Sequence, residues 1–249
     1  MTAEPTDLGA LVTGATSGIG RATAAELASI GVHVILSGRD SPRGEAAVAA
    51  IRADGGKADF LRADLYDAAS ARGLAADAVE LAGHIDILVN NAGVMGPNPT
   101  DPHQAEAVFD KFYAVNVKVP YFLVDELAPA MAGRGHGAIV NVTSMAAQLG
   151  MVPLALYGST KAALVLLTKS WAAQYGGSGV RVNAVSPGPT STEGTARLSE
   201  RHHQLAAAAP AGRPAQPAEI AAAIAYLVSE RASFIQGVIL PVDGGRLAA

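Results

Sequence analysis

Short, continuously apolar runs alternate with longer alanine-rich stretches along almost the entire chain, and this alternation limits the folds open to it. Apolar runs without polar alternation are typical of strands buried on both faces, as in a parallel sheet covered by helices. We therefore predict a doubly wound α/β fold with helices on both faces of the sheet. The predicted strands are residues 9–13, 32–37, 58–62, 86–90, 138–142, 180–185 and 238–242. The predicted helices are residues 19–30, 41–54, 67–82, 105–132 (one long helix or two joined helices), 156–175 and 217–229.

No linker, repeat or low-complexity segment divides the 249 residues. This length fits one large α/β domain or two small ones, and we expect a single domain over residues 1–249. The one irregular stretch, residues 187–216, is rich in Pro, Gly, Ala and charge. We predict a substrate lid near residues 189–213, with His202 and His203 as solvated residues of that lid.

Charge and cysteine content exclude several classes of function. The net charge is −4 and no basic block is present, which argues against an electrostatic surface for nucleic acid or membrane. The absence of cysteine excludes disulfides, thiol catalysis and cysteine-ligated zinc, and the scattered histidines predict no metal site. The first ten residues lack the apolar core of a signal peptide, and no run near 20 residues is apolar enough to span a bilayer. We expect a soluble cytoplasmic protein.

The first predicted strand runs into TGATSGIG, residues 13–20, with glycines at Gly14, Gly18 and Gly20. A pyrophosphate can rest on a helix N-terminus only where no side chain intervenes, and backbone N–H groups and the helix dipole then hold its charge. A tight turn is the simpler interpretation, but the position after the first buried strand favours nucleotide binding. No Walker lysine follows, which argues against a nucleoside triphosphatase.

The ends of the second and third strands carry polar residues suited to the rest of a dinucleotide. The second strand ends in LSGRD, where Ser37 and Arg39 suit the 2′-phosphate of NADP, although Arg39 could simply be solvated and Asp40 could weaken the preference. NAD therefore stays possible. Asp64, at the end of the third strand, could accept a hydrogen bond from the adenine amino group or cap the next helix.

Tyr157 and Lys161, in the stretch YGSTK, are four residues apart and share one face of the predicted helix. A free tyrosine titrates near pH ~10, too high for a proton shuttle at neutral pH, and a fixed ammonium group nearby favours the phenolate. At the end of the fourth strand, the run Asn90 to Gly93 offers small residues for close approach of a ligand and amides that could hold the loop.

With these motifs in place, the chain resembles the classical short-chain dehydrogenase/reductase family, including its 3-oxoacyl-[acyl-carrier-protein] reductase-like members. The resemblance covers residues 9–245 and rests on TGxxxGxG, NNAG, AVNV at Asn116, NVTS at Ser144, YxxxK, Pro187-Gly188 and VDGG, in that order. It implies a seven-stranded parallel sheet, a bound nicotinamide cofactor and a homotetramer.

The resemblance also implies roles for individual residues. Tyr157 would be the general acid or base, Lys161 would bind the nicotinamide ribose and lower the pKa of the tyrosine, Ser144 would hold the substrate oxygen, and Asn116 would hold a water that passes protons to Lys161. Thr192 would bind the nicotinamide carboxamide. The expected cofactor contacts are Gly14, Thr16, Ser17, Gly18, Ile19, Ser37, Arg39, Asp64, Leu65, Asn91, Ala92, Gly93, Tyr157, Lys161, Pro187, Gly188, Thr190 and Thr192.

The sequence says less about the substrate. The expected walls of its site are mostly apolar and suit a medium-sized, weakly polar ketone or alcohol: Val94, Met95, Ser144, Met145, Gln148, Val152, Leu154 and Pro187. Pro129 and Ala173 stand where the carrier-protein reductases would have docking arginines, which weakens a role in fatty-acid synthesis. We predict an NADP(H)-dependent carbonyl reductase. The alternatives are an NAD-dependent secondary-alcohol dehydrogenase and a cofactor-binding regulator without turnover.

Overall fold

The computed structural model describes residues 8–196 and 204–249, and its centre is one parallel sheet of seven strands in the order β3-β2-β1-β4-β5-β6-β7. The strands are β1 (Gly9–Thr13), β2 (His33–Gly38), β3 (Lys57–Arg62), β4 (Ile87–Asn90), β5 (Gly137–Val142), β6 (Val180–Pro187) and β7 (Ile239–Val242). Every neighbouring pair is parallel. The predicted doubly wound fold is confirmed.

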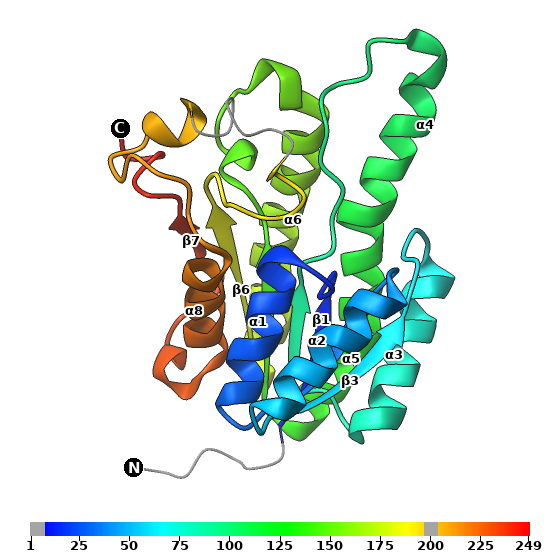
Figure 1. Ribbon diagram of the computed structural model, residues 1–249. Helices are drawn as coiled ribbons and strands as arrows, with labels where there is room; N and C mark the ends of the chain where they lie inside the picture. The colour runs from blue at the N-terminus through cyan, green and yellow to red at the C-terminus, as the bar shows by residue number, and fades with distance from the viewer. Residues whose placement is uncertain (1–7, 197–203) are drawn as a thin grey trace.

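Helices cover both faces of the sheet (Figure 1). They are α1 (Gly18–Ser29), α2 (Ser41–Ala53), α3 (Ala68–Ala82), α4 (Pro102–Tyr113), α5 (Val119–Arg134), α6 (Ala155–Tyr175) and α8 (Pro217–Val228). Helices α1, α2 and α8 pack on one face, and α3, α5 and α6 on the other. The predicted stretch 105–132 proves to be two helices joined by a π-helical turn, Ala114–Lys118. Within residues 8–196 and 204–249, no helix is long and apolar enough to cross a membrane.

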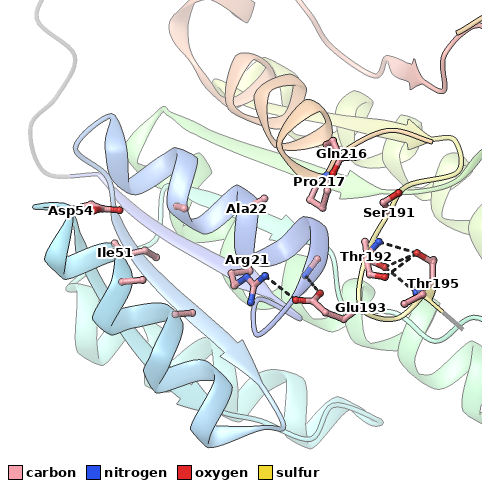
Figure 2. A pocket seen from close by; sticks show the side chains of 15 residues that line it. Arg21, Ala22, Ile51, Asp54, Ser191, Thr192, Glu193, Thr195, Gln216 and Pro217 are labelled. Atoms are coloured by element: carbon pink, nitrogen blue, oxygen red, sulfur yellow. Dashed lines mark hydrogen bonds and ion pairs between the residues drawn. The ribbon is translucent and has the colours of Figure 1, made fainter. Parts of the chain in front are cut away.

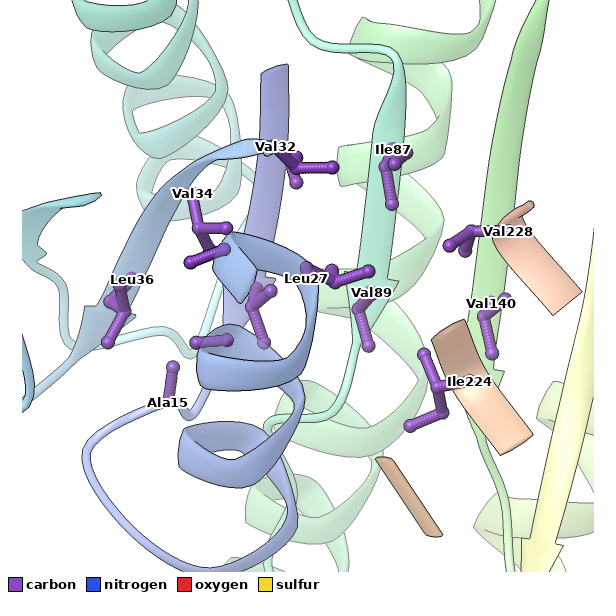
Figure 3. Packing of buried hydrophobic residues seen from close by; sticks show 14 of the residues in the cluster. Ala15, Leu27, Val32, Val34, Leu36, Ile87, Val89, Val140, Ile224 and Val228 are labelled. Atoms are coloured by element: carbon purple, nitrogen blue, oxygen red, sulfur yellow. The ribbon is translucent and has the colours of Figure 1, made fainter. Parts of the chain in front are cut away.

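The strands are apolar along their whole length because both faces are buried. All five residues of β1 are buried, and side chains of β2, β4 and β5 continue the same layer under α1 and α8. Figure 3 shows Leu27 of α1 and Ile224 of α8 packed against Val89 and Val140 of the sheet. Burial on both sides fixes the sheet rigidly, so the loops at its carboxyl edge start from well-defined points.

The strand order reverses beside β1, whose neighbours are β2 and β4. In open α/β sheets, ligands bind at such a switch point, outside the carboxyl ends of the strands. The loops that follow β1 and β4 meet here. The predicted lid begins after β6, and its residues 197–203, including His202 and His203, lie outside the described part of the chain.

Candidate functional site

A pocket of about 1120 Å³ lies at the carboxyl edge of the sheet. Segments far apart in sequence converge on it, namely the glycine loop, the ends of β3, β4 and β5, helix α6 and the segment after β6. Most of the predicted site residues line it: Gly14, Thr16, Ser17, Gly18, Ile19, Arg39, Asp64, Leu65, Asn91, Ala92, Gly93, Val94, Met95, Ser144, Met145, Leu154, Tyr157, Lys161, Pro187, Gly188, Thr190 and Thr192. Ser37, Asn116, Gln148 and Val152 do not line it.

The glycine loop is shaped by its backbone and held by Asn91. Gly14 and Gly18 have φ values of 64° and 54°, which side chains rarely tolerate. The Asn91 amide donates to the carbonyl oxygens of Thr13 at 2.8 Å and Gly14 at 3.1 Å. Ser17 gives α1 no side-chain cap, and Gly18 N donates to the Glu193 carboxylate at 3.1 Å, so the other N–H groups of the first turn are the ones left for an anion.

Arg39 and its acidic neighbour Asp40 have different surroundings at the end of β2. Arg39 lines the pocket, is exposed, and has no hydrogen bond or ion pair among the described residues. Asp40 is instead the N-cap of α2 and accepts from Arg43 N at 3.1 Å. Asp40 therefore does not compete for this end of the pocket. Ser37 is fully buried in the sheet, paired in register with Thr13, one residue short of Gly38 at the pocket edge.

The two interpretations of Asp64 are now distinguishable. The N-cap of α3 is Asp67, whose carboxylate accepts from Ser70 N at 2.8 Å. Asp64 is exposed and lines the pocket beside Leu65. Its carboxylate is thus available to a ligand and does not cap the helix.

Ser144 and Tyr157 meet inside the pocket. Ser144 follows β5 and is the N-cap of the short turn Met145–Ala147, where its hydroxyl accepts from Ala146 N at 3.2 Å. The Ser144 hydroxyl also lies close enough to Tyr157 to influence the pKa of its phenol. Burial raises the pKa of Tyr157, and the hydrogen bond with Ser144 opposes that rise. The phenol is therefore protonated at neutral pH.

Lys161 lies one helical turn along α6, and its side chain is only 4% exposed. Its Nζ donates to the carbonyl oxygen of Val142 at 2.8 Å and lies 5.9 Å from the centroid of the Tyr157 ring. Burial lowers the pKa of Lys161 to about 8. An ammonium group has three donors, so two are left for ligand hydroxyls or water.

Asn116 is fully buried in the π-helical turn, behind the pocket wall. Its Oδ1 accepts from Val94 N at 2.8 Å, and its Nδ2 donates to Val94 O and Thr160 Oγ1, both at 2.9 Å. The amide thus ties the loop after β4 to α6. Both hydrogens of Nδ2 are in use, so a water held by Asn116 must bind the main chain or the second lone pair of Oδ1.

The expected substrate walls are only partly in place. Val152 is 87% exposed, because it lies on the outer side of the turn Val152–Leu154, and Gln148 is also exposed. Met151 and Pro153 line the pocket and were not predicted, whereas Leu205 lines it from within the predicted lid 189–213. Asn98 was also missed: its side chain bonds Val152 O at 2.7 Å and Leu156 N at 3.0 Å, closing this wall. The closeness of residues 151–153 to Tyr157 in the sequence could have indicated that they line the pocket.

The residues present fit a dinucleotide. A Cβ atom at Gly93 would lie 3.2 Å from Asn116 Oδ1 and 3.4 Å from Lys161 Nζ, and one at Gly14 would lie 2.9 Å from Ala92 Cα. The glycines thus let the loops after β1 and β4 pack closely, and the pocket they border is lined from Arg39, past the start of α1, to Tyr157. Within residues 8–196 and 204–249, no group of three or more His, Asp and Glu side chains could hold a metal ion.

Comparisons with known proteins agree with this geometry. Residues 14–246 match the sequence model of a family described as Enoyl-(Acyl carrier protein) reductase. The chain is 38% identical to gluconate 5-dehydrogenase of Gluconobacter oxydans over 240 residues, which is 95% of this chain and 93% of that protein. A solved structure described as a short chain dehydrogenase/reductase family protein is 47% identical, with a TM-score of 0.87 over 97% of this chain and 98% of the other. Another, provisionally described as an NAD(P)-dependent gluconate 5-dehydrogenase from Beutenbergia cavernae with NADP at low occupancy, is 36% identical, with a TM-score of 0.89 over 99% of this chain and 100% of the other.

Proposed function

Because the chain belongs to the classical short-chain dehydrogenase/reductase family of oxidoreductases, we propose that it is an NADP(H)-dependent enzyme acting on a ketone or secondary alcohol. One observation carries this proposal. Ser144, Tyr157 and Lys161 share a pocket with the glycine-rich start of α1, whose N-cap residue Ser17 makes no side-chain bond. A proton donor and an anion-binding helix end in one pocket suit hydride transfer coupled to proton transfer.

Each residue has a distinct part in the proposed mechanism. Tyr157 gives a proton to the carbonyl oxygen in reduction and removes it from the hydroxyl in oxidation. Ser144 donates a hydrogen bond to that oxygen, which strengthens as the oxygen gains charge. Lys161 uses its free donors to hold the nicotinamide ribose, and its positive charge lowers the pKa of Tyr157. The bound nicotinamide supplies or accepts the hydride.

Proton supply completes the proposed cycle. Lys161 is buried except on the pocket side, so protons must reach it through the protein. A water held at the π-helical turn by Asn116 would connect Lys161 to solvent. Because Asn116 Nδ2 is fully bonded, the main chain or Oδ1 would hold that water.

Preference for NADP rests on Arg39. An unpaired guanidinium in the pocket suits a 2′-phosphate, and the adjacent acid in the sequence, Asp40, caps α2. Measured dissociation constants for NADPH and NADH test the preference, and Arg39→Ala should weaken NADPH binding more than NADH binding. A clear preference of the wild-type protein for NADH would refute this part and favour an NAD-dependent alcohol dehydrogenase.

The substrate is proposed to be medium-sized and weakly polar. The pocket wall beyond Ser144 is largely apolar, with Met95, Met145, Met151 and Leu154. Pro129 on α5 and Ala173 on α6 are both exposed, so neither supplies the basic side chain that a carrier protein would dock against. A panel of cyclic ketones, aryl ketones and 3-oxoacyl thioesters, with NADPH consumption as the readout, identifies the class.

Tyr157→Phe is the deciding variant for the mechanism. It should abolish turnover of any ketone found in the panel while NADPH still binds, because the phenyl ring keeps the shape of the pocket and lacks the proton. Full activity in this variant would exclude Tyr157 as the acid. If no ketone in the panel consumes NADPH, a cofactor-binding regulator without turnover becomes the better description.

We also propose that the protein assembles as a homotetramer. Large apolar side chains are exposed on α4, α5 and α6, namely Phe109, Tyr121 and Leu166 at 48%, 45% and 66%. Phe234, after α8, is fully exposed. Large apolar side chains left this exposed are typical of subunit contacts. Light scattering of the purified protein measures the assembly directly, and a monomer would refute the proposal.

A further inference from the structure

The segment that leaves β6 forms a small closed turn beside the pocket. Thr192 N is bonded to Thr195 Oγ1 at 2.9 Å, and Thr195 Oγ1 donates to Thr190 O at 2.9 Å. Two backbone hydrogen bonds hold the base of the turn. Ser191 N donates to Ala215 O, and Ala215 N donates to Pro189 O, both at 2.8 Å. Glu193 therefore lies in a turn that its own hydrogen bonds hold together.

The Glu193 side chain crosses to the first turn of α1. Its Oε2 accepts from Gly18 N at 3.1 Å, and its Oε1 lies 2.8 Å from Arg21 Nη2 (Figure 2). Glu193 is 175 positions from Gly18 and 172 positions from Arg21 in the sequence. Its own backbone N–H lowers the pKa of Glu193, as do Arg21 and Gly18, so the carboxylate is charged at neutral pH. A negative charge at a helix N-terminus is favourable.

Glu193 lies outside the dinucleotide pocket, on the other side of its wall. Thr192, Gly194 and Thr195 line that pocket, whereas Glu193 faces a neighbouring groove of about 720 Å³, with Arg21 and the α1–α2 alanines. Gly18 and Thr192 border both spaces. A Cβ atom at Gly18 would lie 3.0 Å from Thr192 Cγ2, so the turn touches the helix start. The Glu193 carboxylate thus supports this wall from the groove side and does not itself line the dinucleotide pocket.

We propose that Glu193 and Arg21 form a latch that holds the turn 190–196 against α1 and limits how fast the cofactor is exchanged. This inference rests on the proposed binding of a dinucleotide in the pocket. Release of a ligand held between α1 and Thr192 requires the turn to lift away. Breaking the contacts of Glu193 lowers the barrier to that movement.

The test is the release rate constant of NADPH, measured by stopped-flow displacement in the wild type, Glu193→Gln, Arg21→Ala and the double variant. Both single variants should release NADPH about fivefold faster, the size expected for loss of one exposed ion pair. The double variant should be no faster than the singles, because both changes break one latch. Glu26→Gln, which removes a carboxylate from the same helix, is the matched control and should not change the rate.

A purely electrostatic role predicts a different pattern. Arg21→Ala removes a positive charge near an anionic cofactor and would speed release, whereas Glu193→Gln removes a negative charge and would slow it. Opposite signs in the two single variants, or wild-type rates in both, would overturn the latch. Failure of the wild-type protein to bind NADPH or NADH would instead refute the proposed function.

Discussion

The Lys161 ammonium group donates a hydrogen bond to the Val142 carbonyl oxygen at the end of β5, inside the wall of the pocket. This bond holds Nζ above the sheet edge and beside Gly93. It is the one hydrogen bond that the described protein gives this buried charge. Burying an ammonium group with so few partners costs stability, and the cost is visible in its lowered pKa.

Lys161→Met is therefore expected to stabilise the protein at pH 7 while it abolishes turnover. Lowering the pKa from 10.5 to about 8 corresponds to a cost of roughly 3 kcal/mol while both states are protonated. Loss of the bond to Val142 offsets about 1 kcal/mol. A net gain of about 1–2 kcal/mol should appear in urea unfolding.

The pH dependence separates this effect from improved packing. Between about pH 8 and 10.5 the unfolded chain binds more protons at Lys161 than the folded one, so wild-type stability rises with pH there. The advantage of Lys161→Met should be largest below pH 8 and shrink toward pH 10. A gain that is constant across this range would contradict the assigned cause.

Ser144→Ala should move the pH profile of alcohol oxidation as well as lower its rate. Burial raises the pKa of Tyr157 and the Ser144 hydrogen bond lowers it, so removing the hydroxyl raises the pKa further. Oxidation needs the phenolate, so the rising limb of kcat should shift to higher pH, with kcat about 10²-fold lower. Ser144→Thr, which keeps the hydroxyl, should restore the profile. Loss of the turn cap alone would reduce stability and leave the profile in place.

Gly93→Ala should weaken cofactor binding about tenfold with only a small effect on folding. The added methyl group would lie between Asn116 Oδ1 and Lys161 Nζ, at 3.2 and 3.4 Å, in the wall of the pocket. Gly73→Ala is the matched control, because its Cβ in α3 meets no atom within 4 Å. It should stabilise the protein by about 0.5–1 kcal/mol and leave affinity unchanged. Isothermal titration with NADPH measures the affinity of both variants, and urea unfolding measures their stability. Equal affinities for the two variants would count against the pocket assignment.

The sequence predicted the elements whose signal is local. Doubly buried strands are apolar throughout, and polar or glycine residues follow them at the pocket edge, so Gly14 and Asn91 could be assigned from position, whereas Ser144 came from the family resemblance of its NVTS motif. For Ser37 the same reasoning was one residue too early. Ser37 is still paired within the sheet, and Gly38 is the residue that lines the pocket. Strand ends are placed by pairing with neighbours, which a single segment does not reveal.

Features set by contacts between distant segments could not be predicted. Val152 turns outward and Met151 inward because the chain forms a tight turn before α6, braced by Asn98 from 54 residues away. The contact of Glu193 with Gly18 spans 175 positions and leaves no periodic pattern. The AVNV motif identified Asn116, but its bonding to Val94 and Thr160 follows from the π-helical turn.

Asn116→Ala should destabilise the protein by about 3 kcal/mol, more than expected for a residue that only holds a water. Truncation leaves the Val94 N–H and C=O and the Thr160 hydroxyl without the partner that joins them, in a fully buried place. Asn116→Asp is the informative companion, because it keeps the acceptor for Val94 N, loses both donors and adds a buried charge, so it should be at least as unstable. Urea unfolding at pH 7 measures both variants. A loss below about 0.5 kcal/mol in Asn116→Ala, together with strongly reduced turnover, would show that Asn116 acts in proton transfer alone and that its bonds to Val94 and Thr160 contribute little to the fold.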